Sequence, residues 1–538
     1  MMDQSQPGQN HREQTGHDLK VGWFGRLRLF WMVFAFALLF YTQFQFWKQP
    51  SLGDRANWDY FAQVISRGGI PYRDVVNIKS PVSAYISAAA LIAARPFGLR
   101  DIFAIRITFI IMAAFVVAFT YLVTLDTFDS VSAALLAAAL VLSFDFFSAT
   151  NAGGTQPKTP MVLFGLVTLW AILKSRPFEA GCFGMLSALC WQPGLLFAGV
   201  AGLAFSRYLT RWRDKSIARL LAGAIIPLSV LLAYLALAGV LKDFYSWTVA
   251  YTSTVYAPHE LRSVGEFFER ISRMLEGSYR SSRLYFFLAL IGLFVAAARE
   301  IHGGVTSGLR HVVERAPRQA VIVAPIVYFC FCMIDIQGPQ DLIPMIPFVA
   351  AFSALALVYS VERLCSRLAN RRLGTHLAAA IQRFAVSFVV LWVLFFSVKG
   401  ALLYESRFPT LADQDMVVAE IVSRLVPGDK VFVHGQTEIL VLGRLTNATK
   451  YFFLDKDKDQ YLDLVEPGGF AGWFERLKAE RPRIVALARL EEVHHARDFL
   501  DWVAASYEPH FSRVFTYYLR KEEIGKGESG PLPGRSDD

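Results

Sequence analysis

Residues 52–106 read LGDRANWDYFAQVISRGGIPYRDVVNIKSPVSAYISAAALIAARPFGLRDIFAIR. The segment begins with polar and charged residues and lies between two apolar runs, 27–47 and 101–124, each long enough to cross a membrane as a helix. Residues 82–97 are also apolar, but they are few and end in Arg95-Pro96, so we expect a helix in the membrane interface rather than a span. The pattern therefore predicts an outer loop, 48–100, at the membrane surface.

The composition of the whole chain also indicates a membrane protein. Of its 538 residues, 54% are hydrophobic and only 18% are charged, whereas soluble domains are about 25% charged. The net charge is +9, but the basic residues are clustered in short loops. This clustering favours contact with anionic membrane lipid and argues against a nucleic-acid partner.

We expect about eleven spans, because each needs roughly 20 mostly apolar residues. They are placed near residues 27–47, 101–124, 130–148, 159–173, 180–193, 195–207, 218–240, 283–298, 319–335, 342–359 and 377–399.

The basic residues predict a cytoplasmic N-terminus, because positive charge is enriched in loops on the cytoplasmic side. With that orientation, the outer loops 149–158 and 336–341 hold only Lys158. The long first loop is an exception, with Arg55, Arg67, Arg73 and Lys79 outside. The inner loops are 125–129, 174–179, 208–217, 299–318 and 360–376, and they hold Lys174 and Arg176; Arg211, Arg213 and Lys215; Arg299, Arg310, Arg315 and Arg318; and Arg363, Arg367, Arg371 and Arg372. A further outer segment, 241–282, contains an amphipathic stretch, Glu266 to Tyr279, which we expect to lie on the membrane as a mobile lid.

The remainder of the chain changes character after residue 400. Apolar runs shorten, and helix-like and strand-like patterns alternate over 405–522, as in a small α/β domain without a nucleotide-binding glycine motif. The expected organisation is a disordered cytoplasmic tail (1–24), a membrane domain (25–400), a soluble periplasmic α/β domain (401–523) and a disordered tail (524–538). The expected location is the bacterial inner membrane.

The outer loop carries residue types suited to sugar transfer. Asp54 follows the first span, and a carboxylate there can act as a general base for a sugar hydroxyl. Lys79 and Arg73 can hold a phosphate oxygen. The alternative for Asp54 is a helix N-cap for residues 55–67.

The same loop resembles the first outer loop of the GT-C glycosyltransferase superfamily, in its protein O-mannosyltransferase and lipid A aminoarabinose transferase branch. The resemblance rests on Asp54, Gly68-Gly69, Pro71-Tyr72, Asp74, Lys79, Pro81, Phe97-Gly98 and Arg106, with Trp191-Gln192-Pro193-Gly194 and Gln340-Asp341-Leu342-Ile343-Pro344 further on. It implies a GT-C-like membrane fold and transfer, with inversion, of a sugar from a polyprenyl-phosphate donor to a periplasmic, lipid or polysaccharide acceptor. Membrane lipid is the other expected partner.

The resemblance also implies roles for single residues. Asp54 would be the base or would orient the acceptor, and Lys79 would contact the donor phosphate. The chain departs from many relatives because Arg55, not an acid, follows Asp54 and because the 149–158 loop offers Lys158 in place of an acid. The resemblance therefore identifies no metal ligands. No cofactor is expected with certainty, and both a metal-dependent and a metal-independent reaction fit the sequence.

Other polar residues are weaker candidates. For catalysis they are Asp59 and Asp74. The alternatives are a solvated helix face or a structural salt bridge for Asp59, and pairing with Arg73 or capping of the turn for Asp74. For the phosphate it is Lys158, and for the substrate cavity they are Tyr72, Gln192, Gln340 and Asp341, the last two also being expected caps of the next span. His434 is expected to be structural.

Two other functions fit the same pattern. A transporter or flippase of lipid-linked sugars would have a basic outer loop without needing Asp54 as a base, although charged residues within spans are few. A non-catalytic membrane scaffold would depend on its outer α/β domain instead.

Overall fold

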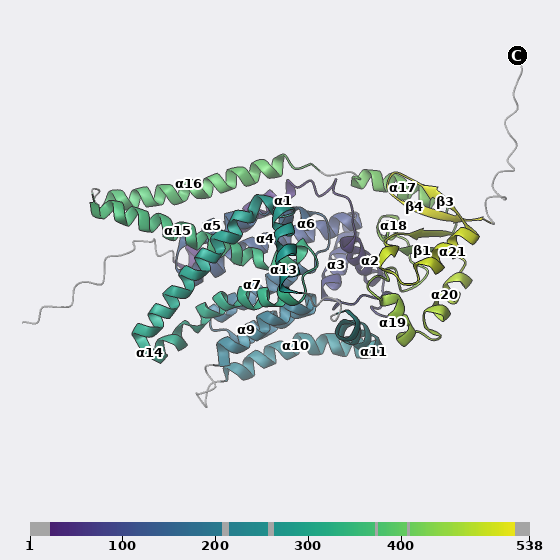
Figure 1. Ribbon diagram of the computed structural model, residues 1–538, viewed down its shortest axis with the longest axis horizontal. Helices are drawn as coiled ribbons and strands as arrows, with labels where there is room; N and C mark the ends of the chain where they lie inside the picture. The colour runs from purple at the N-terminus through teal and green to yellow at the C-terminus, as the bar shows by residue number, and fades with distance from the viewer. Residues whose placement is uncertain (1–21, 207–214, 257–262, 372–374, 406–408, 522–538) are drawn as a thin grey trace, which may run out of the picture.

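The computed structural model describes residues 22–206, 215–256, 263–371, 375–405 and 409–521, without the side chains of 303–315, 368–376 and 378–379. An elongated helical bundle carries a small sheet domain at one end (Figure 1). Most of both tails for which disorder is predicted, residues 1–21 and 522–538, lies outside the described residues, as do Arg211, Arg213 and Arg372.

The bundle is built from long and short apolar helices joined by short turns. In chain order they are α1 (Trp23–Thr42), α2 (Asp54–Ser66), α3 (Val82–Ala94), α4 (Asp101–Phe128), α5 (Val131–Leu142), α6 (Asp145–Ala152), α7 (Lys158–Leu173), α8 (Pro177–Cys190), α9 (Leu195–Ser206), α10 (Ser216–Leu237), α11 (Leu241–Tyr245), α13 (Val264–Glu276), α14 (Arg283–Ile334), α15 (Ile346–Arg371) and α16 (Thr375–Leu402). Short 3₁₀ segments are η1 (Arg95–Phe97), η2 (Gln192–Gly194), η6 (Arg280–Ser282) and η7 (Pro339–Met345), and two π-helical segments are η4 (Ser246–Ala250) and η5 (Thr252–Tyr256).

These helices make the chain a multi-pass membrane protein. In the described parts of the chain, seven helices are long and apolar enough to cross a membrane, or eight if the bent pair α5 and α6 counts as one span. Three further predicted spans correspond to the shorter apolar helices α7, α8 and α9. The predicted interfacial segment 82–97 is the short helix α3 followed by η1.

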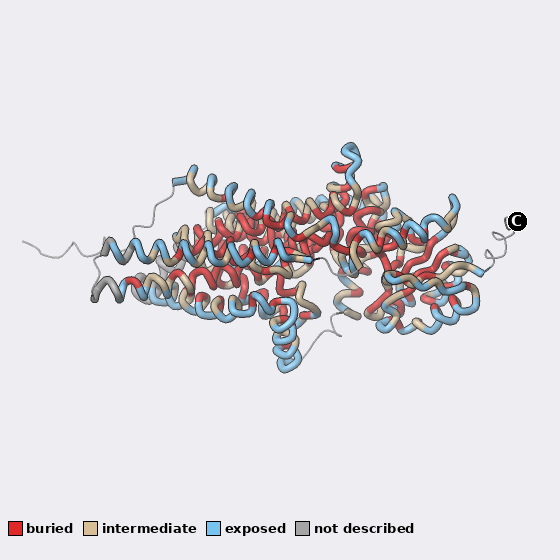
Figure 2. Tube along the Cα trace, turned by 90° about the horizontal axis from the view of Figure 1, so that it is seen from above, coloured by how far each residue is buried: buried red, intermediate tan, exposed pale blue. Residues whose placement is uncertain are grey.

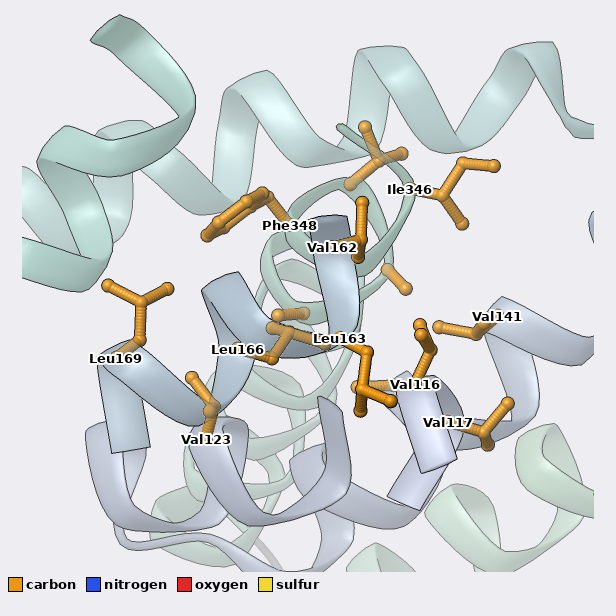
Figure 3. Packing of buried hydrophobic residues seen from close by; sticks show 14 of the residues in the cluster. Val116, Val117, Val123, Val141, Val162, Leu163, Leu166, Leu169, Ile346 and Phe348 are labelled. Atoms are coloured by element: carbon orange, nitrogen blue, oxygen red, sulfur yellow. The ribbon is translucent and has the colours of Figure 1, made fainter. Parts of the chain in front are cut away.

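The helices pack through apolar side chains in the middle of the bundle. Val116 and Val117 of α4 lie beside Leu163 and Leu166 of α7, with Ile346 and Phe348 of α15 completing the cluster (Figure 3). Close approach of α8 and α10 needs glycine: a Cβ on Gly181 would lie 1.9 Å from the Leu220 carbonyl oxygen. Small residues at such contacts are typical of helix pairs in membranes.

The outward faces of the peripheral helices are apolar as well. Phe384, Leu391 and Phe395 of α16 are exposed, as are Ile225 and Val230 of α10. Buried residues run along the inside of the bundle while these outer faces stay exposed (Figure 2). Large exposed apolar faces of this kind are stable in lipid rather than in water.

The C-terminal domain is a four-stranded sheet with helices. Its elements are α17 (Leu411–Ser423), β1 (Val431–His434), α18 (Glu438–Gly443), α19 (Lys458–Val465), α20 (Gly469–Ala479), β2 (Ile484–Leu487), η8 (Leu490–Glu492), α21 (Ala496–Ser506), β3 (Tyr507–Phe511) and β4 (Thr516–Arg520). The strand order is β1-β2-β4-β3, with β1 parallel to β2 and the other two pairs antiparallel. The predicted alternation of helix and strand is confirmed, although β3 was not predicted.

Three local predictions need correction. The expected loop 299–318 is helical, because α14 continues through it. Most of the expected loop 360–376 is helical as well, because α15 runs to Arg371. The expected loop 149–158 begins inside helix α6, and only 153–157 form a turn before α7. The predicted amphipathic helix is confirmed as α13, which starts with a capping box of Ser263 and Glu266, while its role as a lid stays a prediction.

Candidate active site

A cavity of about 1180 Å³ opens where the bundle meets the first outer loop and the C-terminal domain. One end is lined by charged side chains: Asp54, Arg55, Lys79, Lys158, Asp335, Asp341 and Arg489. The other end is apolar and lies between α9 and the last part of α14, lined by Leu195, Leu196, Gly199, Val200, Leu203, Val327, Phe331 and Ile334. The lining of the cavity thus combines a charged part with an apolar part.

Asp54 is exposed at the charged end as the first residue of α2. Gly53, not Asp54, is the N-cap, so the alternative that Asp54 caps this helix is wrong. Gly53 has φ +55°, a conformation that favours glycine. Its N–H donates to Glu438 Oε1 at 2.8 Å, and a Cβ at this position would lie 2.8 Å from Arg489 Nη2. Two side chains of the C-terminal domain therefore hold the turn that presents Asp54.

Lys79 reaches the cavity from the turn before α3. Its N–H donates to Asn77 Oδ1 at 3.1 Å, and its carbonyl oxygen accepts from the hydroxyl of Tyr72 at 2.9 Å. Within the part of the chain that the structure describes, no carboxylate lies within 4.0 Å of its ammonium, which sits 5.2 Å from the Trp191 ring centre. Burial and the nearby charge of Lys158 lower the pKa of Lys79 to about 8. An anion entering the cavity would stabilise the charged form.

Lys158 lies near the same tryptophan, Trp191. As the first residue of α7, it pairs with Asp341 at 2.8 Å and sits 4.3 Å from the Trp191 ring centre. Asp341 also accepts from the backbone N–H groups of Gln337 and Gly338, at 2.8 and 2.9 Å. The expected capping role of Asp341 is therefore confirmed, and the ion pair adds a contact that the sequence did not predict.

Two predicted cavity residues also line it. Gln192 donates to the Ile78 carbonyl oxygen at 3.3 Å, and Gln340 lies beside Asp341 in η7. Tyr72 does not line this cavity. It is fully buried with φ +68°, and its hydroxyl donates to the Lys79 carbonyl oxygen.

Asp59 is not on a solvated face, so that prediction is wrong. Its side chain is fully buried, and Oδ1 accepts from both the N–H and the hydroxyl of Thr155, at 3.2 and 2.6 Å. Burial raises the pKa of Asp59 to about 6. Because Thr155 belongs to the turn that leads to Lys158, Asp59 ties that turn to α2 behind the cavity.

Arg73 and Asp74 lie outside the cavity. They pair with each other at 3.2 Å on the surface, and Asp74 Oδ2 accepts from the Ile70 N–H at 2.7 Å. The expected pairing of Asp74 with Arg73 is confirmed, and this geometry brings neither residue to the other candidates.

The C-terminal domain supplies residues that the sequence did not predict. Glu438 and Arg489 lie beside the Gly53–Asp54 turn although more than 380 residues separate them from it in the chain. His434 is structural, as expected: its Nε2 accepts from the Leu454 N–H and its Nδ1 donates to the Ala488 carbonyl oxygen, both at 3.0 Å. A local sequence signal for Glu438 or Arg489 does not exist, because each acts through contacts distant in the chain.

No metal site fits the described side chains. Among them, no group of three or more His, Cys, Asp or Glu side chains is placed to hold an ion. Asp341, an acid that lines the cavity, is paired with Lys158.

Solved structures with the same fold could be found, although no family model and no curated protein sequence matches the chain. ArnT from Cupriavidus metallidurans bound to undecaprenyl phosphate superposes with a TM-score of 0.61 at 13% identity, over 95% of this chain and 100% of that one. The archaeal oligosaccharyltransferase AglB from Archaeoglobus fulgidus, in complex with an inhibitory peptide and a dolichol-phosphate, gives 0.51 at 12% identity, over 93% and 75%. The A. fulgidus oligosaccharyltransferase complex with Zn and sulfate gives 0.51 at 14% identity, over 91% and 73%. The chain therefore shares the overall fold of these membrane glycosyltransferase structures.

Proposed function

We propose that the chain is a membrane glycosyltransferase that takes a sugar from a polyprenyl-phosphate carrier and transfers it to an acceptor outside the cytoplasm. The observation that carries this proposal is the lining of the large cavity, which combines charged side chains, among them Lys79 and Lys158, with apolar side chains of α9 and α14. A polyprenyl phosphate has the same two parts, an anionic head and a long apolar tail. The ArnT structure that shares this fold was solved with undecaprenyl phosphate.

In this proposal the two lysines around Trp191 hold the carrier phosphate. Lys79 has no carboxylate partner among the described residues, whereas Lys158 is held by Asp341 and so is fixed in place before the carrier arrives. Two ammonium groups near one aromatic ring concentrate positive charge at the point where the phosphate becomes the leaving group. Charge stabilisation fixed in advance is the main need of such a leaving group.

Asp54 is the proposed base, or it orients the acceptor hydroxyl. The acceptor oxygen attacks the anomeric carbon, the bond from that carbon to the phosphate oxygen breaks, and the hydroxyl proton passes to the Asp54 carboxylate. The polyprenyl phosphate leaves as an anion against Lys79 and Lys158. A single displacement of this kind inverts the anomeric configuration.

The proposed orientation has the N-terminus in the cytoplasm and the domain 401–523 in the periplasm of a bacterium. Basic residues in or beside the expected cytoplasmic loops support it, as the positive-inside rule requires. Of these, Arg26 and Lys174 both pair with Asp126, at 3.0 and 2.8 Å, and Arg318 pairs with Asp129.

The test is sugar transfer by purified protein in liposomes loaded with extracted polyprenyl-phosphate sugars and envelope acceptors. Removing the base, Asp54→Asn, is expected to slow carrier turnover by about 10²- to 10⁴-fold. Asp74→Asn is the matched control, because it changes a carboxylate of the same loop that lies outside the cavity. The same assay with and without EDTA measures metal dependence.

Two outcomes would replace the proposal. If labelled carrier crosses the bilayer equally well in both variants without turnover, the chain is a flippase. If neither process occurs and function in cells depends only on the C-terminal domain, the chain is a scaffold.

A further inference from the structure

A cavity of about 410 Å³ lies among α4, α14 and α15, apart from the candidate active site. Helix α4 begins at Asp101, whose carboxylate accepts from Gln63 of the first outer loop at 3.0 Å. The cavity lies at the other end of this helix, at Thr127 and Phe128. Because the 28 residues of α4 extend for about 40 Å, which exceeds the thickness of the hydrocarbon core of a bilayer, the cavity and the first outer loop lie at opposite membrane surfaces.

Two parts of α14 meet α4 at this cavity. Arg299 and Arg318 both line it, and they belong to the two stretches of α14 that are each long and apolar enough to cross a membrane, Arg280–His302 and Ala316–Ile334. The lining also includes the apolar side chains of Phe128, Ile322 and Leu355. The cavity thus offers charged and apolar contacts at the level where the helices leave the membrane.

Two arginines at this surface share one aromatic ring. The guanidinium carbons of Arg299 and Arg363 lie 4.7 and 5.1 Å from the centre of the Tyr359 ring, and Arg363 Nε donates to the Tyr359 hydroxyl at 2.8 Å. Among the side chains that the structure describes, neither guanidinium has a carboxylate within 4.0 Å. Like charges held at one ring repel each other, and a bound anion would offset that repulsion.

The carboxylates near these arginines are already engaged. Asp129 pairs with Arg318, and Glu362 accepts from Gln382 of α16 at 3.4 Å. Glu300, which lines the cavity, also interacts with another group of the protein. The two guanidiniums at Tyr359 are therefore the charges that an anion can reach without displacing a carboxylate.

The surroundings of these guanidiniums fit a phosphate that is carried by a lipid. The planar fork of a guanidinium matches the oxygens of a phosphate group. A phospholipid holds its phosphate at the membrane surface, where this cavity lies, and its glycerol and acyl chains can contact the apolar part of the lining. Basic pockets between membrane-spanning helices are typical sites for such head groups.

We infer that this cavity binds the head group of an anionic phospholipid, with the phosphate on Arg299 and Arg363. A volume of about 410 Å³ has room for roughly thirty water-sized groups, which is enough for a phosphoglycerol head group. The proposed orientation places this lipid in the cytoplasmic leaflet. The site involves neither Asp54 nor the donor cavity, so the inference stands apart from the proposed function.

The test uses the full chain in a non-ionic detergent after its lipids have been removed. Native mass spectrometry counts the lipids that stay bound as phosphatidylglycerol is added. Wild type should bind one phosphatidylglycerol more tightly than it binds phosphatidylcholine, whose head group has no net charge. Arg299→Gln and Arg363→Gln should each raise the Kd of that lipid by about 5-fold. Thermal unfolding of each variant checks the fold, and the two variants test one site from two helices.

Three controls accompany the titration. Arg219→Gln removes an exposed arginine near the start of α10, at the same membrane surface in the proposed orientation, and should leave the Kd unchanged. Lys79→Gln removes a cation of the large cavity and should also leave it unchanged. Inorganic phosphate at the concentration of the lipid should not displace it.

Several results would overturn the inference. They are equal binding of phosphatidylglycerol by wild type, Arg299→Gln and Arg363→Gln, an equal loss in Arg219→Gln or Lys79→Gln, and equal binding of phosphatidylcholine. Displacement of the lipid by inorganic phosphate would identify a soluble phosphate as the ligand instead. Sugar transfer is not measured in this titration, so its failure leaves the proposed function unaffected.

Discussion

Replacement of His434 tests whether this side chain stabilises the segments of the C-terminal domain that lie beside the candidate site. Its ring joins the Leu454 N–H to the Ala488 carbonyl oxygen, and these two residues adjoin Phe453 and Arg489. Since Nε2 accepts a hydrogen bond from a backbone N–H, the ring is neutral, with its proton on Nδ1. Burial lowers the pKa of His434 to about 4.

The magnitude follows from linkage between protonation and folding. The folded domain holds the His434 ring in its neutral form. The stability that the neutral ring contributes is therefore complete above pH 6.5, the pKa of histidine in an unfolded chain, and is lost as the pH falls toward 4. Each pH unit in that interval lowers the free energy of opening by about 1.4 kcal/mol, so the whole interval lowers it by ~3 kcal/mol.

The assay is hydrogen exchange by mass spectrometry on the full chain, with exchange rates corrected for pH and read from peptides covering 451–458. His434→Gln cannot titrate, so its stability deficit relative to wild type should shrink by ~3 kcal/mol between pH 6.5 and pH 4. His510→Gln, on β3 away from this contact, should follow wild type throughout. A deficit of His434→Gln that stays constant over this pH range would refute the reasoning.

Three further predictions concern the donor site, the turn before Asp54 and the bundle. Undecaprenyl phosphate binding to wild type should weaken by about tenfold per pH unit above pH 8, as the Lys79 ammonium loses its proton, whereas Lys79→Arg should show a flat titration over the same range. Glu438→Ala leaves the Gly53 N–H without its acceptor, at a cost of about 1–3 kcal/mol. Introduced into the wild-type chain, this change should lower carrier turnover, whereas introduced into Asp54→Asn it should cause no further loss. An equal loss in both chains would contradict action through Asp54. Gly181→Ala places a Cβ 1.9 Å from the Leu220 carbonyl oxygen and should lower stability in thermal unfolding by about 1–3 kcal/mol, while Gly202→Ala, with no atom within 4 Å, should unfold like wild type.

The membrane fold was predictable from the sequence because its cause is local. Apolar runs such as 101–124 must bury their backbone groups as helices in lipid whatever surrounds them. The exposed apolar faces of α10 and α16 and the seven helices of spanning length follow from composition alone. The outer loop was predictable for a related reason, since its polar turn residues and charges cannot enter a span.

The candidate site was predictable only in part. Asp54, Lys79, Lys158, Gln192, Gln340 and Asp341 were chosen from the sequence, and all six line one cavity. Asp59 and Asp54 are chemically the same and five residues apart, yet one is buried against Thr155 and the other is exposed. Residue type and spacing do not distinguish them, because burial depends on the turn 153–157 packing on α2.

What tertiary structure alone decided is which distant groups meet at Asp54. Glu438 and Arg489 enter the site across more than 380 residues, and Asp341 meets Lys158 across more than 180. No local pattern marks these partners, since a buried hydrogen bond or ion pair depends on two surfaces being brought together by the packing of every helix between them. The sequence by itself determined that the chain is a membrane protein, and it predicted which outer loop contributes to the candidate site. The packing of the C-terminal domain on that loop determined the environment of the Asp54 carboxylate, because burial and neighbouring charge depend on contacts between distant parts of the chain.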